Sequence, residues 1–159
     1  MTLKLSRLLA LLLGTTLLSA CADTTAFLGT NTTPSSRFTS GVAVGTSMRF
    51  VGAEFEYAAT SEDTAASAPS LKTGMASGFL QTPMAFHGLQ PYFAAGAGIY
   101  REGLNDQTDT GIASNIGGGV KIALTGPVRL RVDYRRLQLG SGALFSPAHR
   151  LYAGLNLSF

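Results

Sequence analysis

The feature that most constrains the fold is an alternation of apolar and polar residues that recurs along most of the chain. It is clearest at the end of the sequence, where Leu151, Ala153, Leu155, Leu157 and Phe159 are apolar and the residues between them are polar or small. A period of two is the period of a β-strand, because successive side chains point to opposite faces of a sheet. Similar or weaker alternation covers residues 24–31, 38–50, 51–58, 71–82, 89–100, 112–124 and 128–135. The sequence therefore predicts an all-β chain with eight strands of roughly ten residues, the length that crosses a bilayer when tilted.

Alternation alone fits two architectures. A soluble barrel places its apolar face inside, whereas a membrane barrel places it against lipid and its polar face in the lumen. Here the polar face carries charged side chains together with many of the 19 glycines. This mixture suits a narrow lumen, because such a lumen has little room for large side chains. We therefore predict an antiparallel, up-and-down, eight-stranded transmembrane β-barrel over residues 23–159, present as a monomer. Its predicted lumen charges are Arg49, Glu54, Glu56, Lys72, Lys121, Arg129, Arg131, Asp133 and Arg135.

The N-terminus reads as an export signal over residues 1–22, with two cations, an apolar stretch from Leu8 to Leu18 and small residues after it. Two cleavage sites fit equally well. Ala20-Cys21-Ala22 matches an ordinary signal peptidase site, and residues 18–21 match a bacterial lipobox that would leave Cys21 as a lipidated first residue. Either outcome exports the protein and leaves 10 Lys and Arg against 9 Asp and Glu.

The connections fall into two sets. Residues 49–52, 82–88 and 125–127 are predicted to form periplasmic turns, and residues 32–37, 60–70, 101–110 and 140–149 are predicted to form longer outer loops. Any partner of the protein is expected to bind these outer loops, residues 60–70 and 101–110 above all.

The sequence resembles the small outer-membrane β-barrel domain family, which includes OmpA-like and opacity-type barrels. The resemblance rests on QPYFAAGAGIYREG (residues 90–103) and on the ending NIGGGVKIALTGPVRLRVDYRRLQL…HRLYAGLNLSF. It implies an integral protein of the outer membrane of a Gram-negative-type bacterium. It also implies that Leu155, Leu157 and Phe159 contact the barrel-assembly machinery during insertion. The chain departs from many such barrels in having no Trp, so its interfacial aromatic residues must be Tyr and Phe.

Several classes of function are excluded or disfavoured. The small net charge argues against nucleic-acid binding, and a single Cys excludes an internal disulfide framework and a Cys-rich zinc site. No phosphate loop or dinucleotide fingerprint is present, and no cofactor or metal is expected.

The internal charges allow two interpretations. Glu54 and Glu56 are expected to pair with Arg129, Arg131 and Arg135, because unpaired charges in a narrow lumen are very costly. Such pairs either lock a closed barrel or gate a narrow channel, and the closed barrel is favoured because eight strands leave little more room than their own side chains need. A further alternative is a soluble periplasmic barrel, anchored by a lipid on Cys21, that binds an apolar ligand inside.

Three other groups of residues carry possible chemistry. His87 and His149 are candidate bases of an acyl hydrolase, but no nucleophile lies at a suitable spacing. Glu102, Asp106 and Asp109 are candidate ligands of a divalent cation in an outer loop, but their spacing matches no known calcium motif. Four residues near the predicted outer ends of strands are candidates to meet lipopolysaccharide phosphates: Arg37, Arg101, Arg136 and Arg150. The sequence thus favours a structural or surface-interacting outer-membrane protein over an enzyme.

Overall fold

A computed structural model describes residues 21–159. The predicted signal peptide and lipobox fall almost entirely on residues 1–20, outside the described residues. Their last members, Cys21 and Ala22, belong to the first strand of the fold. The side chain of Cys21 is exposed.

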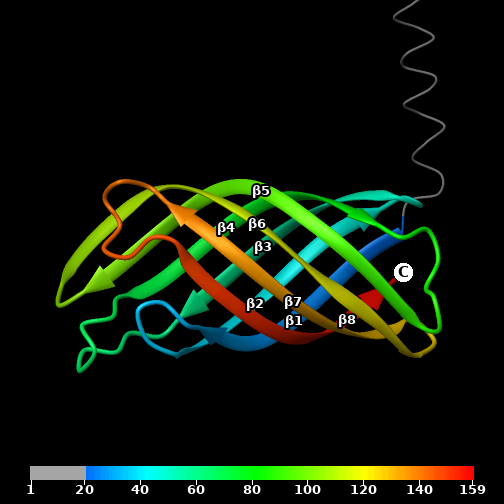
Figure 1. The fold of residues 1–159 in the computed structure, drawn as a ribbon, viewed down its shortest axis with the longest axis horizontal. Helices are drawn as coiled ribbons and strands as arrows, with labels where there is room; N and C mark the ends of the chain where they lie inside the picture. Colours follow the sequence, from blue (N-terminus) through cyan, green and yellow to red (C-terminus); the bar gives the residue numbers. More distant parts are fainter. Residues whose placement is uncertain (1–20) are drawn as a thin grey trace, which may run out of the picture.

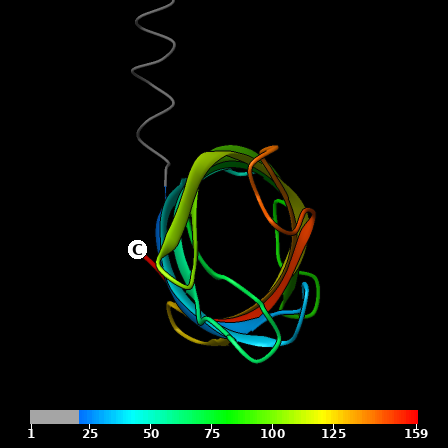
Figure 2. The same cartoon turned by 90° about the vertical axis from the view of Figure 1, so that its left-hand side faces the viewer.

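The described chain is a closed barrel of antiparallel strands, in which each strand pairs with the next and the last pairs with the first (Figures 1 and 2). The strands are β1 (Cys21–Asn31), β2 (Arg37–Ser47), β3 (Val51–Thr60), β4 (Ser70–Gln81), β5 (Leu89–Leu104), β6 (Gln107–Thr125), β7 (Val128–Leu139) and β8 (Ala148–Ser158). The predicted fold of eight antiparallel up-and-down strands is confirmed. The part of the chain that the structure describes contains no helix long and apolar enough to cross a membrane.

The two faces of the strands are sorted as a membrane barrel requires. Large apolar residues stand on the outer wall, and Phe55, Tyr57 and Phe93 expose 54%, 46% and 51% of their surface. The charged residues Arg131 and Asp133 are almost completely buried in the lumen. A soluble barrel with an apolar ligand inside would need the opposite arrangement, so this alternative is contradicted by the direction in which the side chains point.

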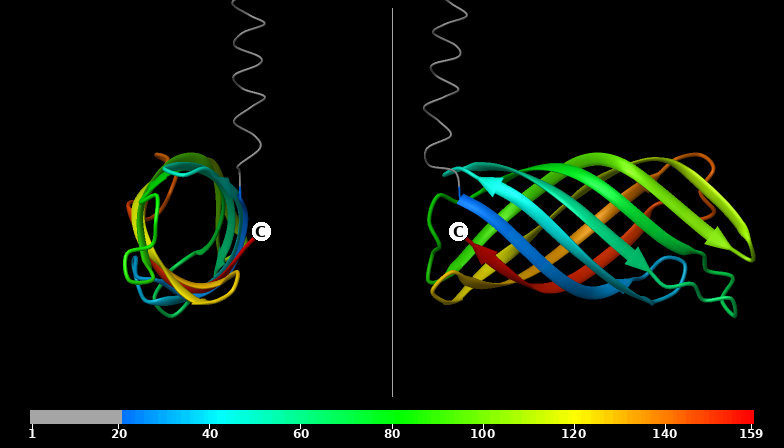
Figure 3. Two further views of the ribbon diagram at one scale, coloured as in Figure 1. Left: turned by 90° about the vertical axis from the view of Figure 1, so that its right-hand side faces the viewer. Right: turned by 180° about the vertical axis from the view of Figure 1, so that it is seen from behind.

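The connections lie in two sets at opposite ends of the barrel. The turns after β2, β4 and β6 lie at the end of the barrel that holds the C-terminus, and the connections after β1, β3, β5 and β7 lie at the other end, here called the outer end (Figures 1 and 3). One predicted loop is wrong. Residues 101–110 continue β5 and β6 as a hairpin that closes with Asn105 and Asp106, both at positive φ. Asn and Asp tolerate that backbone conformation, which explains how a two-residue turn replaces the expected loop.

Candidate functional site

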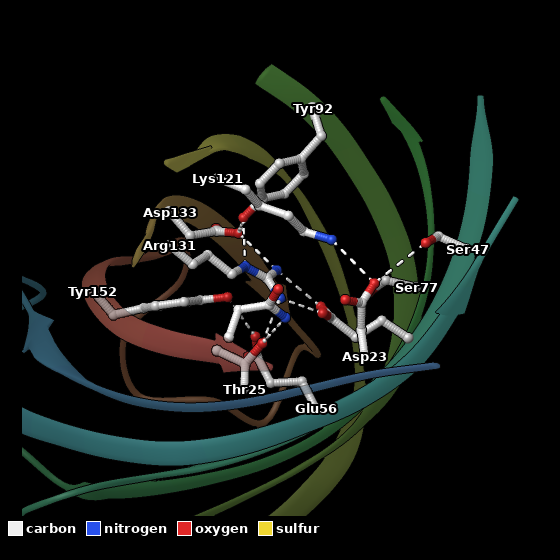
Figure 4. Close-up of polar contacts among 12 residues, drawn as sticks. Asp23, Thr25, Ser47, Glu56, Ser77, Tyr92, Lys121, Arg131, Asp133 and Tyr152 are labelled. Carbon is white, nitrogen blue, oxygen red and sulfur yellow. Dashed lines mark hydrogen bonds and ion pairs between the residues drawn. The ribbon is translucent and has the colours of Figure 1, made fainter. Parts of the chain in front are cut away.

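The lumen is the most distinctive part of the molecule, and Arg131 on β7 lies at its centre. Its guanidinium forms an ion pair with Glu54 on β3, in which Nη2 donates to Oε1 at 3.0 Å and Nη1 donates to Oε2. Nη2 also donates to Oδ2 of Asp133 at 3.0 Å, and Nε donates to the hydroxyl of Tyr92 at 2.6 Å. The rings of Tyr92 and Tyr152 lie 4.9 and 5.7 Å from the guanidinium carbon (Figure 4). Arg131 is therefore held by charge, hydrogen bonds and aromatic faces at once.

Arg135, four residues further along the same face of β7, shares the same two carboxylates. Its Nε donates to Oδ1 of Asp133 at 2.7 Å, and its Nη2 donates to Oε1 of Glu54 at 3.2 Å. Two guanidinium groups thus enclose two carboxylates within the lumen.

A second cluster lies next to the first, toward the outer end. Arg150 on β8 donates from Nη1 to Oε1 of Glu56 at 2.8 Å and from Nη2 to the hydroxyl of Thr73 at 3.0 Å. The hydroxyl of Tyr152 donates to the other oxygen of Glu56 at 3.0 Å. The Tyr152 ring stacks on Phe27 with centroids 4.0 Å apart, which fixes the position of its hydroxyl.

A third cluster lies toward the end of the barrel that holds the C-terminus. Nζ of Lys121 donates to Oδ2 of Asp23 at 3.1 Å, and the hydroxyl of Ser47 donates to the same oxygen at 3.3 Å (Figure 4). Lys121 also stands 5.1 Å from the centre of the Phe79 ring.

Together these clusters form what we call the lumen network. Its charges balance, because four cations face four carboxylates and all of them are buried. The members are Lys121, Arg131, Arg135 and Arg150 with Asp23, Glu54, Glu56 and Asp133.

An apolar layer lies beyond the lumen network toward the outer end. It packs side chains from five neighbouring strands and is contributed by Leu71, Met75, Tyr100, Ala113, Leu137, Leu139 and Ala148. Thr60 on β3 is the cross-strand partner of Leu71, and Thr39 on β2 is the partner of Thr60, so polar side chains complete this level of the lumen. The lumen therefore contains paired charges and, toward the outer end, a layer that is apolar over five of the eight strands.

Three predicted lumen residues, Arg49, Lys72 and Arg129, do not belong to the network. Arg49 is exposed in the turn after β2, because that strand ends at Ser47. Lys72 is exposed on the outer wall, since β4 turns Leu71 and Thr73 inward. The alternation of β4 is ambiguous because apolar residues occupy both of its faces. Arg129 points toward the lumen but is only half-buried, and it donates to Gln90 at 3.0 Å.

Four residues that belong to the lumen network or contact it are not among the predicted lumen residues: Asp23, Arg150, Tyr92 and Tyr152. The sequence analysis includes Asp23 only as the first residue of the barrel segment, and it assigns Arg150 to the outer rim. Tyr92 and Tyr152 are aromatic but occupy the polar positions of their alternating segments. That position was the available signal, because a Tyr hydroxyl can join a polar network while its ring fills space.

Two of the four arginines that are predicted at the outer rim lie there, and the other two do not. Arg101 and Arg136 are exposed on the outer wall, as a rim requires, but Arg37 and Arg150 are buried inside. Arg37 donates to the backbone oxygen atoms of Thr33 at 2.6 Å and of Pro69. Lys72, which is predicted in the lumen, is exposed near this rim together with Arg101 and Arg136.

The candidate catalytic and metal-binding residues do not assemble into sites. Nδ1 of His149 lies 2.6 Å from the hydroxyl of Tyr134, outside the barrel, and His87 is exposed in the turn after β4. Asp109 accepts a hydrogen bond from Tyr100, and Glu102 accepts one from the backbone of Leu144. Among residues 21–159, no group of three His, Cys, Asp or Glu side chains is arranged to hold a metal ion.

Comparisons with known proteins identify the fold. No family model matches the sequence, and no curated protein matches it. Neisserial surface protein A matches the structure with a TM-score of 0.69 and 18% identity, covering 88% of this chain and 97% of that one. The N-terminal β-barrel domain of Pseudomonas aeruginosa OprF matches with a TM-score of 0.67 and 16% identity, covering 87% and 97%. The outer membrane enzyme PagL matches with a TM-score of 0.52 and 14% identity, covering 85% and 98%. The chain therefore has the fold of the small eight-stranded outer-membrane β-barrels.

Proposed function

We propose that this protein is an integral β-barrel of the bacterial outer membrane with a structural or surface-interacting role and no catalytic activity. The observation that carries the proposal is the lumen network, in which four buried cations are matched by four buried carboxylates. Such an interior braces a barrel and leaves its outer wall and its outer end as the surfaces that meet other molecules.

The same interior argues against a channel. Opening a path for ions would separate buried ion pairs and leave charges without their partners in a narrow lumen, which is costly. The ions would also have to pass the apolar layer around Leu71 and Leu137. A narrow channel gated by Glu54 and Arg131 is therefore the less favoured function.

Planar-bilayer recording tests this choice directly. The purified wild-type protein is expected to give no steady conductance, and Arg131→Ala is expected to give none either, because the apolar layer remains. Arg49→Ala serves as the matched control, since Arg49 is exposed in a turn and belongs to neither layer. Reproducible single-channel steps from the wild type that change in Arg131→Ala, but not in Arg49→Ala, would refute the closed barrel.

Localisation is tested on isolated outer membranes. The protein is expected to resist extraction by urea and carbonate, and to change its mobility on a gel when the sample is boiled in SDS. Release by urea with no boiling-dependent shift would overturn the assignment to the membrane.

The enzyme hypothesis has a separate test. Lipid A isolated from cells that express the protein is expected to carry the same acyl chains as lipid A from cells without it. A loss or gain of an acyl chain that disappears in His149→Ala would show that the barrel is an enzyme.

A further inference from the structure

The charges on the outer wall of the barrel are all of one sign. Among residues 21–159, every carboxylate that lies within a strand is buried or half-buried, and none is exposed on the wall. The exposed charged residues within the strands are Lys72, Arg101 and Arg136. All three lie near the outer ends of their strands, just beyond the apolar part of the wall.

Two of these cations are direct neighbours. Lys72 on β4 is the cross-strand partner of Arg101 on β5, and both side chains point outward. Side chains at directly opposite positions have Cβ atoms about 4.5–5.5 Å apart, and like charges there repel each other. Within the described chain, neither residue forms an ion pair or a side-chain hydrogen bond. The protein therefore holds two positive charges together without supplying the negative charge that would stabilise them.

Among the described residues, the third exposed cation, Arg136, has no second cation beside it, so the pair of adjacent cations occurs on one side of the barrel only. Its cross-strand partners are Ile116 and His149, and His149 is engaged by the hydroxyl of Tyr134. Arg136 is thus an isolated cation at the same rim, which makes it a useful comparison.

The wall next to the cation pair is apolar, and it leads along β4 to a shallow, open hollow. The next outward residues along β4 and β5 are Gly74 and Ile99, which are again direct partners. Further along β4, Ala76 and Gly78 line a hollow of about 660 Å³ together with Val44 and Phe55. The rise per strand residue is about 3.3 Å, so this hollow begins roughly 13 Å from Lys72 along the strand. That separation suits a molecule with a charged head and an apolar tail.

We propose that Lys72 and Arg101 bind the phosphate of a phosphorylated membrane lipid, whose acyl chain lies along the apolar wall of β4. The inference rests on the proposed membrane location and goes beyond it by assigning the residues that recognise the lipid. Arg offers a planar set of donors that matches phosphate oxygens, and Lys adds a point charge. A bound phosphate removes the repulsion between the two cations.

The test uses the purified, folded full chain in neutral-detergent micelles, titrated with bis-phosphorylated lipid A. Native mass spectrometry counts the lipid bound and gives the concentration for half occupancy. A basic residue near an anionic lipid surface contributes about 1 kcal/mol, which corresponds to roughly a fivefold change in affinity. The double substitution Lys72→Gln/Arg101→Gln is therefore expected to raise the half-occupancy concentration by about 25-fold. Arg49→Gln, an exposed cation at the opposite end, is expected to leave it unchanged, and Arg136→Gln is expected to change it by about fivefold or less.

Two further arms separate the sources of the phosphate. Lipid A without its phosphates is expected to bind as weakly to the wild type as phosphorylated lipid A binds to the double variant. Inorganic phosphate at the same phosphorus concentration is expected not to displace the lipid, and displacement would assign the site to a free anion instead. Equal binding by the wild type and the double variant would overturn the proposal. A boiling-dependent gel shift on every sample shows that the barrel is folded, so failure of the membrane assignment and failure of lipid recognition give different results.

Discussion

Arg131 and Glu54 form an ion pair that spans the barrel, although 77 residues separate them in the sequence. They belong to β7 and β3, which lie on opposite sides of the closed sheet. The pair links two strands that share no backbone hydrogen bonds, and Asp133, Arg135 and Tyr92 extend it to neighbouring positions. The lumen network is therefore a transverse support for the barrel wall.

Removing one member of this pair is expected to destabilise the barrel strongly. Arg131→Met leaves Glu54 buried with a weaker set of partners, and the free energy of unfolding is expected to fall by about 3–5 kcal/mol. The double variant Glu54→Gln/Arg131→Met is expected to lose less than Arg131→Met alone, because no carboxylate is then stranded. Urea unfolding in lipid vesicles measures both. Arg49→Met is the control and is expected to stay within about 0.5 kcal/mol of the wild type. A double variant that lost as much stability as Arg131→Met alone, or more, would show that the stranded carboxylate is not the source of the effect.

The sequence was informative about the architecture because the period of two is a local property. The strands follow from the alternation, and the outward direction of Phe55 and Phe93 follows from the alternation together with the charges and glycines on the opposite face. The prediction failed where alternation was weak. In β4 both faces carry apolar residues, so the alternation wrongly predicts Lys72 in the lumen. Arg49 is wrongly predicted there because the predicted strand over residues 38–50 is longer than β2, which ends at Ser47.

The pairing within the lumen was harder to predict, because it depends on the register and the stagger of the closed barrel. Glu54 and Glu56 are two residues apart on β3, yet Glu54 pairs with Arg131 and Arg135 while Glu56 pairs with Arg150. Arg150 shares the polar positions of its alternating segment with Tyr152, so the sequence already indicates its inward direction. Arg37 is the first residue of β2, where the sequence alone does not distinguish the inside of the mouth from the outer rim.

Gly41 on β2 is expected to be essential for packing inside the lumen. A Cβ atom at this position would overlap the ring of Phe27 and the backbone oxygen of Tyr57. Gly41→Ala would displace Phe27 from its stack on Tyr152, whose hydroxyl donates to Glu56. We expect a loss of about 1–3 kcal/mol, the usual range for overpacking, measured as a lower temperature of the boiling-dependent gel shift. Gly126→Ala is not a suitable control because Gly126 has a positive φ. Gly78→Ala is suitable, since the nearest atom to its added Cβ would be 3.9 Å away, and it is expected to be near neutral.

The stability of the outer end is expected to depend on pH through Glu102. This residue follows Arg101 on β5 and lies beyond the apolar part of the wall, outside the segment that would cross a membrane. Burial raises the pKa of the Glu102 carboxyl above its ordinary value, although the hydrogen bond from Leu144 and the charge of Arg37 oppose the rise. Above the raised pKa the folded protein holds a buried carboxylate and is destabilised by it. As the pH falls through the raised pKa, the folded protein takes up a proton before the unfolded chain does, and the penalty disappears.

Glu102→Gln is accordingly expected to melt at a higher temperature than the wild type at pH 8. The difference is expected to shrink as the pH falls toward the ordinary Glu value of about 4.3. The boiling-dependent gel shift, recorded as a function of temperature at several pH values, measures this difference. Glu62→Gln, in the exposed connection after β3, is the control and is expected to show no such pH dependence. A Glu102→Gln variant less stable than the wild type at pH 8 would mean that the carboxylate stabilises the outer end.

Phe159 offers a way to separate the stability of the folded barrel from its assembly in the cell. Its backbone exchanges two hydrogen bonds with Ala22, at 2.8 and 3.2 Å, where β8 closes onto β1, while its side chain is exposed. Phe159→Ala keeps both backbone hydrogen bonds and removes only the exposed ring. If Leu155, Leu157 and Phe159 form a signal for the barrel-assembly machinery, Phe159→Ala is expected to lower the folded fraction in outer membranes while refolding from urea into detergent stays unchanged. Leu28→Ala, another exposed apolar residue on the outer wall, is the control and is expected to assemble normally. Equal losses of Phe159→Ala in cells and in detergent would instead assign Phe159 to the stability of the seam between β8 and β1.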